Sequence, residues 1–318
     1  MMTWWSDRTV VVTGGAGFLG RVVCAKLAER GCQRIAVPRR AQYELTTEAG
    51  VERMYDELRP DVVLHLAAEV GGIGINREQP GRFFYANMAM GLHLVEQARR
   101  HGLEKFIHVG TVCAYPKFSP VPFQEDDLWN GYPDETNAPY GVAKKSIFVM
   151  LDAYRDQYGM KSAVVVPVNL YGPGDNFDPG SSHVVPALIR KCVEARDANL
   201  PSIECWGTGE ASREFLYVDD AAEGILAAAE RIDEPLPINL GTGREIRIRD
   251  LVELIARETG FTGRIEWDGT KPDGQPRRCL DTTRAETLLD WRANIDFGEG
   301  IRRTISWYLA ARANGRAA

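Results

Sequence analysis

Short apolar runs rich in β-branched residues alternate with segments of helical periodicity through the first half of the chain. The runs are RTVVVTG (8–14), QRIAVP (33–38), DVVLHLAA (61–68), KFIHVGT (105–111) and KSAVVVPVNL (161–170). Between them, apolar residues recur with helical spacing over Phe18–Arg30, Thr47–Leu58, Arg82–His101 and Tyr140–Tyr158. Runs that are apolar on both faces are typical of parallel strands covered by helices. The pattern therefore predicts an α/β fold with a doubly wound parallel sheet.

The residue composition of the chain changes after Tyr171. The stretch GPGDNFDPGSS is rich in Gly, Pro and Asp, as loops are, and the elements beyond it are shorter and more mixed. We therefore expect a sheet domain at 1–171, to which some later segments return, and a smaller C-terminal α/β substrate-binding region at 172–318. The two parts are expected to share an interface with a cleft in it.

Two of the expected helices carry wide apolar stripes. Their apolar positions are Met88, Leu92, Leu94 and Val95 on one helix, and Ile147, Phe148, Met150, Leu151 and Tyr154 on the other. A stripe of this width faces either the sheet alone or the sheet and a second subunit. The sequence therefore leaves two explanations for the stripes. They form the helix bundle of a homodimer, or they are buried within one chain.

Composition and charge exclude several classes of function. The 318 residues carry a formal net charge of -6 and no long Lys/Arg run, so neither nucleic acid nor an anionic membrane is an expected partner. The chain has no signal-peptide pattern and no apolar run of the ~20 residues that a membrane span needs, which predicts a cytoplasmic protein. Its six cysteines are scattered without metal-ligand spacing, so we expect no metal site and no disulfide.

A glycine-rich turn follows the first expected strand. Gly14, Gly17 and Gly20, with Phe18 and Leu19 between them, permit a tight turn and a close approach of backbone to a pyrophosphate at a helix N-terminus. At the first strand-helix junction of an alternating chain, this predicts a Rossmann-type dinucleotide site.

Residues after the second expected strand bear on the choice of cofactor. Arg39 and Arg40 suit a ribose 2'-phosphate and favour NADP(H), whereas a carboxylate there would suit NAD(H). Glu44 lies slightly further on, so NAD(H) stays open as the alternative.

Tyr140 and Lys144 stand four residues apart near the start of a long helix, on one helical face. The ammonium can lower the pKa of the phenol, which then exchanges a proton with a carbonyl oxygen. With the glycine turn and Thr111 after the fourth strand, the pair resembles the extended short-chain dehydrogenase/reductase superfamily. That resemblance implies that Thr111 binds the substrate oxygen and that Lys144 holds the nicotinamide ribose.

Longer motifs resemble the GDP-L-fucose synthase family, whose members are GDP-4-keto-6-deoxy-mannose 3,5-epimerase-4-reductases. The matching segments are HLAAEVGGIGINREQP, GTVCAYPK, NAPYGVAKK, PVNLYGPGDNF, SSHVVPALIRK, WGTGEASREFLYVDD and KPDGQPRRCLD. The resemblance implies that Cys113 and His183 are the base and acid that invert two carbon centres. Without His183, Cys113 would read as a small packing residue.

The chemistry implied by this resemblance requires those residue types. A hydrogen beside a ketone is removable when the enolate oxygen is stabilised, a task for the hydroxyls of Thr111 and Tyr140. Inversion needs a base, Cys113, on one face and an acid, His183, on the other. His183 precedes an expected helix whose positive end disfavours imidazolium and makes it a readier donor. Hydride from NADPH then reduces the C4 ketone while Tyr140 supplies the proton.

The resemblance also implies binding positions, and here the chain departs from the family pattern. For the cofactor these are Gly14, Gly17, Phe18, Leu19, Gly20, Arg39, Arg40, Ala67, Ala68, Tyr140, Lys144, Pro167, Asn169, Leu170 and His183. For the nucleotide sugar they are Val70, Gly71, Asn169, Val184, Lys191, Trp206, Arg213 and Lys271. Lys191 stands where the family often has Arg, and Thr111 where it usually has Ser.

Alternatives therefore stay open. One is a sibling enzyme acting on a different GDP- or dTDP-keto-sugar. Another is a 3,5-epimerase without net redox, although there we expect a lysine in place of His183. A third is a module that binds NADP without catalysis, which the intact Thr111, Tyr140 and Lys144 argue against.

Overall fold

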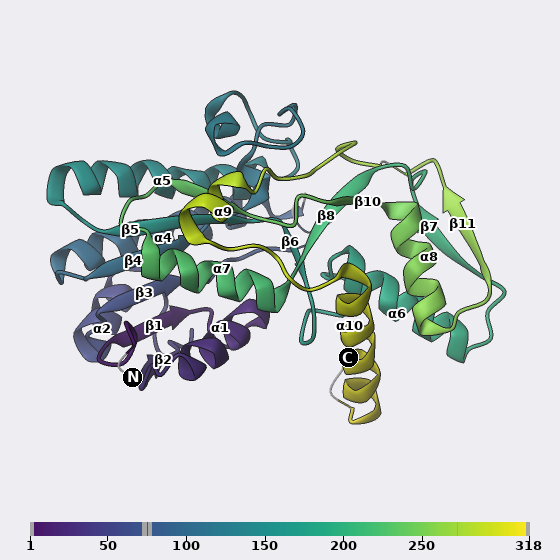
Figure 1. Cartoon of the computed structure of the whole chain (residues 1–318), viewed down its shortest axis with the longest axis horizontal. Helices are drawn as coiled ribbons and strands as arrows, with labels where there is room; N and C mark the ends of the chain where they lie inside the picture. Colours follow the sequence, from purple (N-terminus) through teal and green to yellow (C-terminus); the bar gives the residue numbers. More distant parts are fainter. Residues whose placement is uncertain (1–2, 72–74, 76–77, 272, 316–318) are drawn as a thin grey trace.

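A six-stranded parallel sheet forms the larger part of the molecule. The computed structural model describes residues 3–71, 75, 78–271 and 273–315. Its sheet has the order β2-β1-β3-β4-β5-β9 (Figure 1). The strands are β1 (Thr9–Thr13), β2 (Arg34–Ala36), β3 (Val62–His65), β4 (Lys105–Val109), β5 (Ser162–Pro167) and β9 (Pro237–Leu240). The predicted α/β, Rossmann-type fold is confirmed. The order in which successive strands are added to the sheet reverses between the neighbouring parallel strands β1 and β3.

Helices cover both faces of this sheet (Figure 1). On one face α1 (Phe18–Glu29) packs against α7 (Val218–Arg231), and α9 (Thr283–Leu289) packs on α7. On the other face lie α2 (Glu48–Leu58), α4 (Pro80–Arg100) and α5 (Ala138–Tyr158). The short helices η1 (Val112–Ala114) and η2 (Glu125–Trp129) lie between β4 and α5. This arrangement leaves the carboxyl ends of the parallel strands for ligands.

The predicted helices exist, with shifted ends. The helices α4 and α5 begin at Pro80 and Ala138, two residues earlier than expected. Each has a proline in its first turn, where the missing N–H costs no hydrogen bond.

The strand predicted over 161–170 is wrong, because that segment forms two strands in two sheets. Strand β5 ends at Pro167, and β6 (Asn169–Tyr171) pairs with β8 (Ser212–Tyr217) instead. Between them, the Val168 N–H still donates to Leu240 O (3.0 Å). Proline lacks the N–H that a central strand needs, but the apolar run through Val168 conceals the break.

The smaller part is built on two short sheets, β10-β8-β6 and β11-β7. Its further elements are β7 (Ser202–Trp206), β10 (Glu245–Arg247), β11 (Arg264–Asp268), α6 (Val184–Asp197), α8 (Ile248–Thr259) and α10 (Phe297–Ala313). These elements surround a second hydrophobic core that is distinct from the core of the large sheet. The functional division at Tyr171 into a cofactor part and a substrate part stays a prediction.

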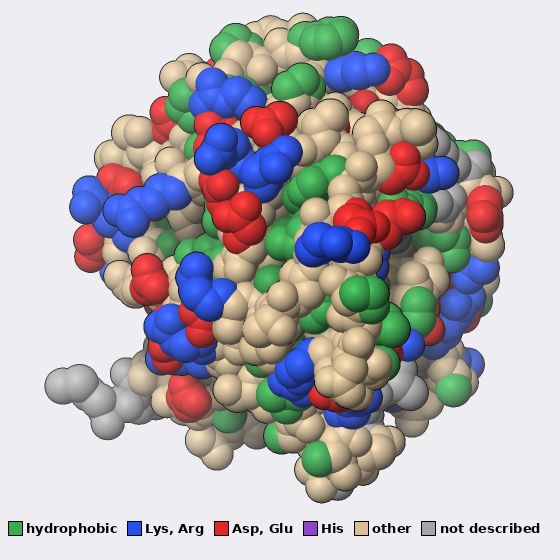
Figure 2. Space-filling view, turned by 90° about the vertical axis from the view of Figure 1, so that its right-hand side faces the viewer, with side chains coloured by type: hydrophobic (Ala, Val, Ile, Leu, Met, Phe, Trp, Pro, Cys, Tyr) green, Lys and Arg blue, Asp and Glu red, His purple; other side chains and the backbone are tan. Residues whose placement is uncertain are grey.

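Charges of both signs are interspersed on the end of the molecule that carries the smaller part (Figure 2). Among the described residues, none of the helices has the length and apolar character needed to cross a membrane. Within the same residues, no cluster of His, Cys, Asp or Glu is placed to hold a metal ion. All six cysteines are free thiols.

Candidate active site

The glycine-rich turn lies at the carboxyl end of β1, beside β3. Gly14 has φ +72, and a Cβ on it would lie 2.9 Å from the backbone nitrogen of Ala67. A Cβ on Gly20 would overlap the carbonyl oxygen of Gly14. No side chain caps the N-terminus of α1, so its first N–H groups are available to an anion. The turn thus has the shape and the donors that a pyrophosphate requires.

A cavity of about 410 Å³ opens above this turn. Nine predicted cofactor residues line it together, namely Gly14, Gly17, Phe18, Leu19, Gly20, Arg39, Arg40, Ala67 and Ala68. Sequence reasoning missed further lining residues, among them Tyr43, Leu45, Thr46, Glu69 and Met90. All but Met90 follow the ends of β2 and β3, so the rule that ligands bind at carboxyl ends of strands could have found them.

Arg39 and Arg40 differ in their partners. Arg40 donates to Glu44 (Nε to Oε2, 2.8 Å) and lies 3.3 Å from a carboxylate oxygen of Glu69. The guanidinium of Arg39 is exposed, and among the described residues it has no partner. Arg39 is thus a cation without an ion pair, and Arg40 is a cation partly neutralised by two carboxylates. Such a pair at the cavity edge suits a ribose 2'-phosphate better than a ribose hydroxyl.

Thr111, Cys113 and Tyr140 come together where α5 packs on the end of β4. Thr111 caps η1, and its hydroxyl accepts a hydrogen bond from the Cys113 N–H (3.2 Å). Burial raises the pKa of Tyr140 well above its usual range, the nearby Cys113 thiol raises it further, and a hydrogen bond with Thr111 lowers it. A Cβ on Gly141 would overlap the carbonyl oxygen of Cys113, so the helix lies directly against η1. Phenol, hydroxyl and thiol therefore share one site.

Lys144 is buried one turn further along α5. Burial lowers its pKa from 10.5 to about 7. Two buried histidines, His65 and His108, lie beneath it on β3 and β4, with ring centroids 5.5 Å apart. Burial, and then the charge of Lys144, lower the pKa of both, so neutral imidazoles surround the ammonium.

His183 is the N-cap residue of α6, at the end of the loop that follows β6. His183 is an exposed residue, yet the protein around it removes part of the water that would solvate the imidazolium, which lowers the pKa of His183. The pKa of His183 is lowered, as the sequence analysis expected. The cause is loss of solvation and not the positive end of the helix.

The predicted substrate cations lie in the smaller part. The Nζ atom of Lys271 lies 5.7 Å from the centroid of the exposed Trp206 ring, and Lys191 donates to Glu204 O (2.6 Å). The Asn169 amide donates to Glu214 O on β8 (2.9 Å).

Arg213 has a second arginine beside it, which sequence reasoning missed. Burial, and then the charge of Arg278, lower the pKa of Arg213 to about 10. Arg278 is 9% exposed and donates to Gln275 Oε1 at 3.0 and 3.2 Å. Among the described residues, neither arginine forms a salt bridge with a carboxylate. The carboxylates of Asp273 and Asp134 act on Arg213 through their charge but form no ion pair with it, so two adjacent cations remain available to an anionic ligand.

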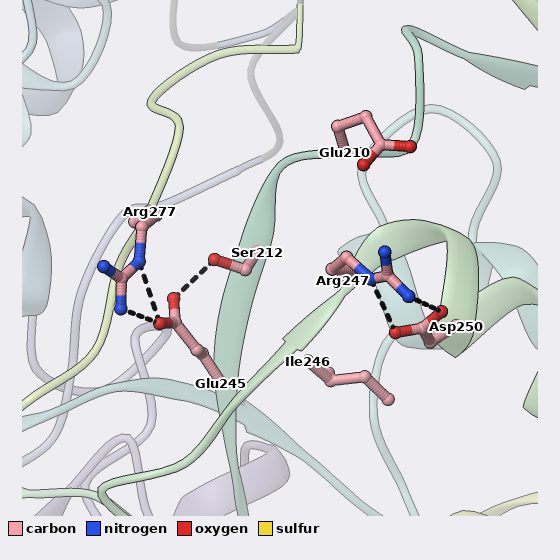
Figure 3. A pocket seen from close by; sticks show the side chains of 7 residues that line it. All are labelled: Glu210, Ser212, Glu245, Ile246, Arg247, Asp250 and Arg277. Atoms are coloured by element: carbon pink, nitrogen blue, oxygen red, sulfur yellow. Dashed lines mark hydrogen bonds and ion pairs between the residues drawn. The ribbon is translucent and has the colours of Figure 1, made fainter.

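The other predicted residues do not line the cavity of about 410 Å³. Val70 is exposed and Gly71 buried after β3, and Pro167 and Leu170 flank the crossing from β5 to β6. Val184 begins α6. The cavity of about 460 Å³ drawn in Figure 3 is lined by none of the predicted residues, and both of its arginines pair with carboxylates of the lining, as Arg247 does with Asp250 (2.9 Å).

The fold and the site define a class, and comparison with known proteins agrees with it. Residues 10–241 match the NAD dependent epimerase/dehydratase family, and the chain belongs to that family. Its relatives include GDP-L-fucose synthase 1 of Arabidopsis thaliana, which is 37% identical over 306 residues, 96% of this chain and 94% of the relative. The expected resemblance to the GDP-L-fucose synthases is thus confirmed.

Solved structures give the same fold. A GDP-L-fucose synthetase from Naegleria fowleri bound to NADP has a TM-score of 0.91 at 27% identity, over 99% of this chain and 96% of that one. A GDP-6-OMe-4-keto-L-xylo-heptose reductase from C. jejuni has a TM-score of 0.90 at 25% identity, over 97% and 99%.

Proposed function

We propose that this chain is an NADPH-dependent epimerase-reductase that converts GDP-4-keto-6-deoxy-D-mannose to GDP-L-fucose in the cytoplasm. The family and the relatives support the coarser part, a nucleotide-sugar epimerase and reductase. The unpartnered Arg39 at the cavity edge supports NADPH over NADH.

One observation carries the proposal, namely the cluster of Thr111, Cys113 and Tyr140. A hydroxyl pair that binds the C4 oxygen would stabilise an enolate, and the neighbouring Cys113 thiol, two residues from Thr111, is a group that could serve as the base at the adjacent carbon. We assign Cys113 as the base at C3 and C5 and His183 as the acid that returns the proton on the opposite face.

The reduction uses the same hydroxyls. When bound, NADPH supplies the hydride for C4. Tyr140 then donates its proton to the C4 oxygen, and a protonated Lys144 beneath it favours the phenolate that remains. Trp206, Lys191, Arg213 and Lys271 would hold the GDP moiety, with Asn169 at the junction of sugar and cofactor.

Product identification tests this function. The protein is mixed with NADPH and GDP-4-keto-6-deoxy-D-mannose, and the product is identified by NMR. GDP-L-fucose is the expected product, with one NADPH consumed per sugar. Consumption of NADPH without inversion at C3 and C5 would show a reductase alone.

A second candidate is reduction or epimerisation of a different GDP-keto-sugar. The structural likeness to the C. jejuni heptose reductase favours it, as do Thr111 and Lys191 at positions where the fucose synthases usually have Ser and often Arg. Turnover of another nucleotide keto-sugar, with none of the deoxymannose compound, would establish this sibling activity.

A further inference from the structure

Glu214 on β8 is a fully buried carboxylate whose partners all belong to two other segments of the chain. Its Oε1 atom accepts hydrogen bonds from the N–H groups of Thr242 and Gly243 (2.7 Å for Gly243) and from the Thr242 hydroxyl (3.2 Å). Its Oε2 atom accepts from the Leu280 N–H (2.7 Å). Among the described residues it forms no salt bridge, so main-chain N–H groups, the Thr242 hydroxyl and the Cys279 thiol stabilise the buried charge.

The two segments that Glu214 holds come from different parts of the fold. Thr242 and Gly243 follow β9, the last strand of the large sheet, whereas Leu280 lies in the segment between β11 and α9. Glu214 itself lies in the small sheet β10-β8-β6. The carboxylate therefore joins both sheets and the segment that runs between them.

The same segment carries Arg278, two residues before Leu280. Arg213 is the neighbour of Glu214 on β8, and successive side chains of a strand point to opposite faces. The segment is also bound to β8 through the Ser212 N–H, which donates to Pro276 O (2.9 Å). Bonds at Pro276 and Leu280 thus fix Arg278 relative to Arg213 from both sides.

We propose that Glu214 is a positioning residue for nucleotide binding, because it holds Arg278 beside Arg213 so that the two guanidiniums meet the diphosphate of the substrate together. This inference rests on the proposed function. The buried Arg278 and the partly buried Arg213 repel each other, and Arg278 would turn toward solvent if its segment were free. A fixed segment presents both cations before the ligand arrives and reduces the ordering cost of binding.

Substitution Glu214→Gln tests the role. The amide keeps one acceptor oxygen but presents an NH₂ group to a main-chain N–H, so the bond to Leu280 or the bonds to Thr242 and Gly243 must break. The Kd for GDP, measured by calorimetry, is expected to rise at least about tenfold, whereas the Kd for NADPH changes less than about twofold. The thermal midpoint of each variant is recorded in the same samples.

Two further variants separate position from charge. Asp250 on α8 pairs with Arg247 (2.9 Å) (Figure 3) and, among the described residues, forms no hydrogen bond with either held segment. Asp250→Asn removes one carboxylate charge from the smaller part, and GDP affinity should stay within about twofold. Gly241→Ala keeps the carboxylate but places a Cβ against Oε1, and should weaken GDP binding as Glu214→Gln does.

The outcomes are distinct. Equal loss of GDP and NADPH affinity in Glu214→Gln, or unchanged GDP affinity, would overturn the positioning role. If the wild-type protein does not bind GDP at all, the proposed function fails instead. If Glu214→Gln is too unstable to assay, the Gly241→Ala variant decides. Unchanged GDP affinity in Gly241→Ala would also overturn the inference.

Discussion

Tyr140 and Lys144 share one helical face, and burial moves the pKa of the two groups in opposite directions. The pKa of the phenol rises and that of the ammonium falls to about 7, because each loses hydration of its charged form. Near neutral pH, a small change in the surroundings of Lys144 therefore decides whether it carries a proton. Under the proposed function, the negative charge of bound NADPH would favour the charged form of Lys144, which is the form that would assist proton transfer from Tyr140.

The buried Lys144 makes the stability of the protein depend on pH. Between about pH 7 and its ordinary pKa of 10.5, the unfolded chain binds one more proton here than the folded chain, so stability rises with pH. Lys144→Met is expected to be more stable than the wild type near about pH 6, with a difference that shrinks as the pH rises toward about 10. Urea unfolding across this range measures the free energy of unfolding.

The exposed Lys161 provides the control for this prediction. It pairs with Asp233, which raises its pKa, so Lys161→Met should show no such shrinking difference. A constant gap between Lys144→Met and the wild type at every pH would contradict the assignment of a lowered pKa to Lys144.

Cys113 is a second testable residue, through its proposed role as the base. Cys113→Ser replaces the thiol by a much weaker base, so solvent deuterium uptake at C3 and C5 should fall at least about 100-fold. Mass spectrometry of the recovered nucleotide sugar measures it. Cys24 is also a partly exposed thiol, and Cys24→Ser should keep normal uptake. Undiminished uptake in Cys113→Ser would remove Cys113 from the mechanism.

At the scale of elements, the site depends on close approaches that side chains would prevent. The turn at Gly14 lies against the backbone after β3, and Gly141 on α5 lies against η1. The first contact shapes the cofactor cavity and the second brings Tyr140 to Cys113. Both contacts are made by glycine, the only residue without a Cβ.

Gly14→Ala tests the first of these contacts. The positive φ costs about 1 kcal/mol for alanine, and the new Cβ must displace the backbone of Ala67. NADPH affinity, measured by fluorescence titration, is expected to fall at least about tenfold. Gly102 also has positive φ (+64), with no atom within 4 Å of a Cβ. Gly102→Ala should lose similar stability and keep its affinity, and equal affinities in both variants would refute the role of the turn.

The sequence predicted elements better than it predicted where they pair. Apolar runs predicted β1 to β5, most clearly β3, β4 and β5, because strands that are buried on both faces consist largely of apolar residues. The last of these runs did not reveal the break at Pro167, because the apolar residues continue through Val168 and Leu170 while β6 hydrogen-bonds to a different sheet. Which strands pair cannot be read from the periodicity of a segment when the partners lie far apart in the sequence.

At the scale of the whole molecule, the apolar stripes of α4 and α5 are only partly covered. Leu94, Val95 and Ile147 are buried within the chain. This agrees with the expectation that the stripes face the sheet of their own chain. Other apolar side chains on these helices are exposed, namely Phe84, Tyr85, Leu92, Val149 and Tyr158. We propose that a second copy of the chain covers them and forms the homodimer.

Sedimentation tests this dimer. The wild-type protein is expected to sediment at twice the mass of one chain. A double variant, Leu92→Glu with Val149→Glu, places charges in the proposed interface and should sediment as a monomer. Leu200 is equally exposed (50%) but lies after α6, so Leu200→Glu should stay dimeric. A wild-type monomer, or a dimer unaffected by the double variant, would rule out this interface.

The chain by itself determined the class of the fold, and it predicted the cofactor turn and the pair of Tyr140 and Lys144. Each depends on local rules: strand periodicity, glycine conformation, and a spacing of four on a helix. Only the tertiary structure decided that Arg278 lies beside Arg213, that Glu214 ties three segments together, and that Lys144 is buried above two histidines. Those relations join residues from separate segments, and burial and dielectric surroundings arise only when the segments pack.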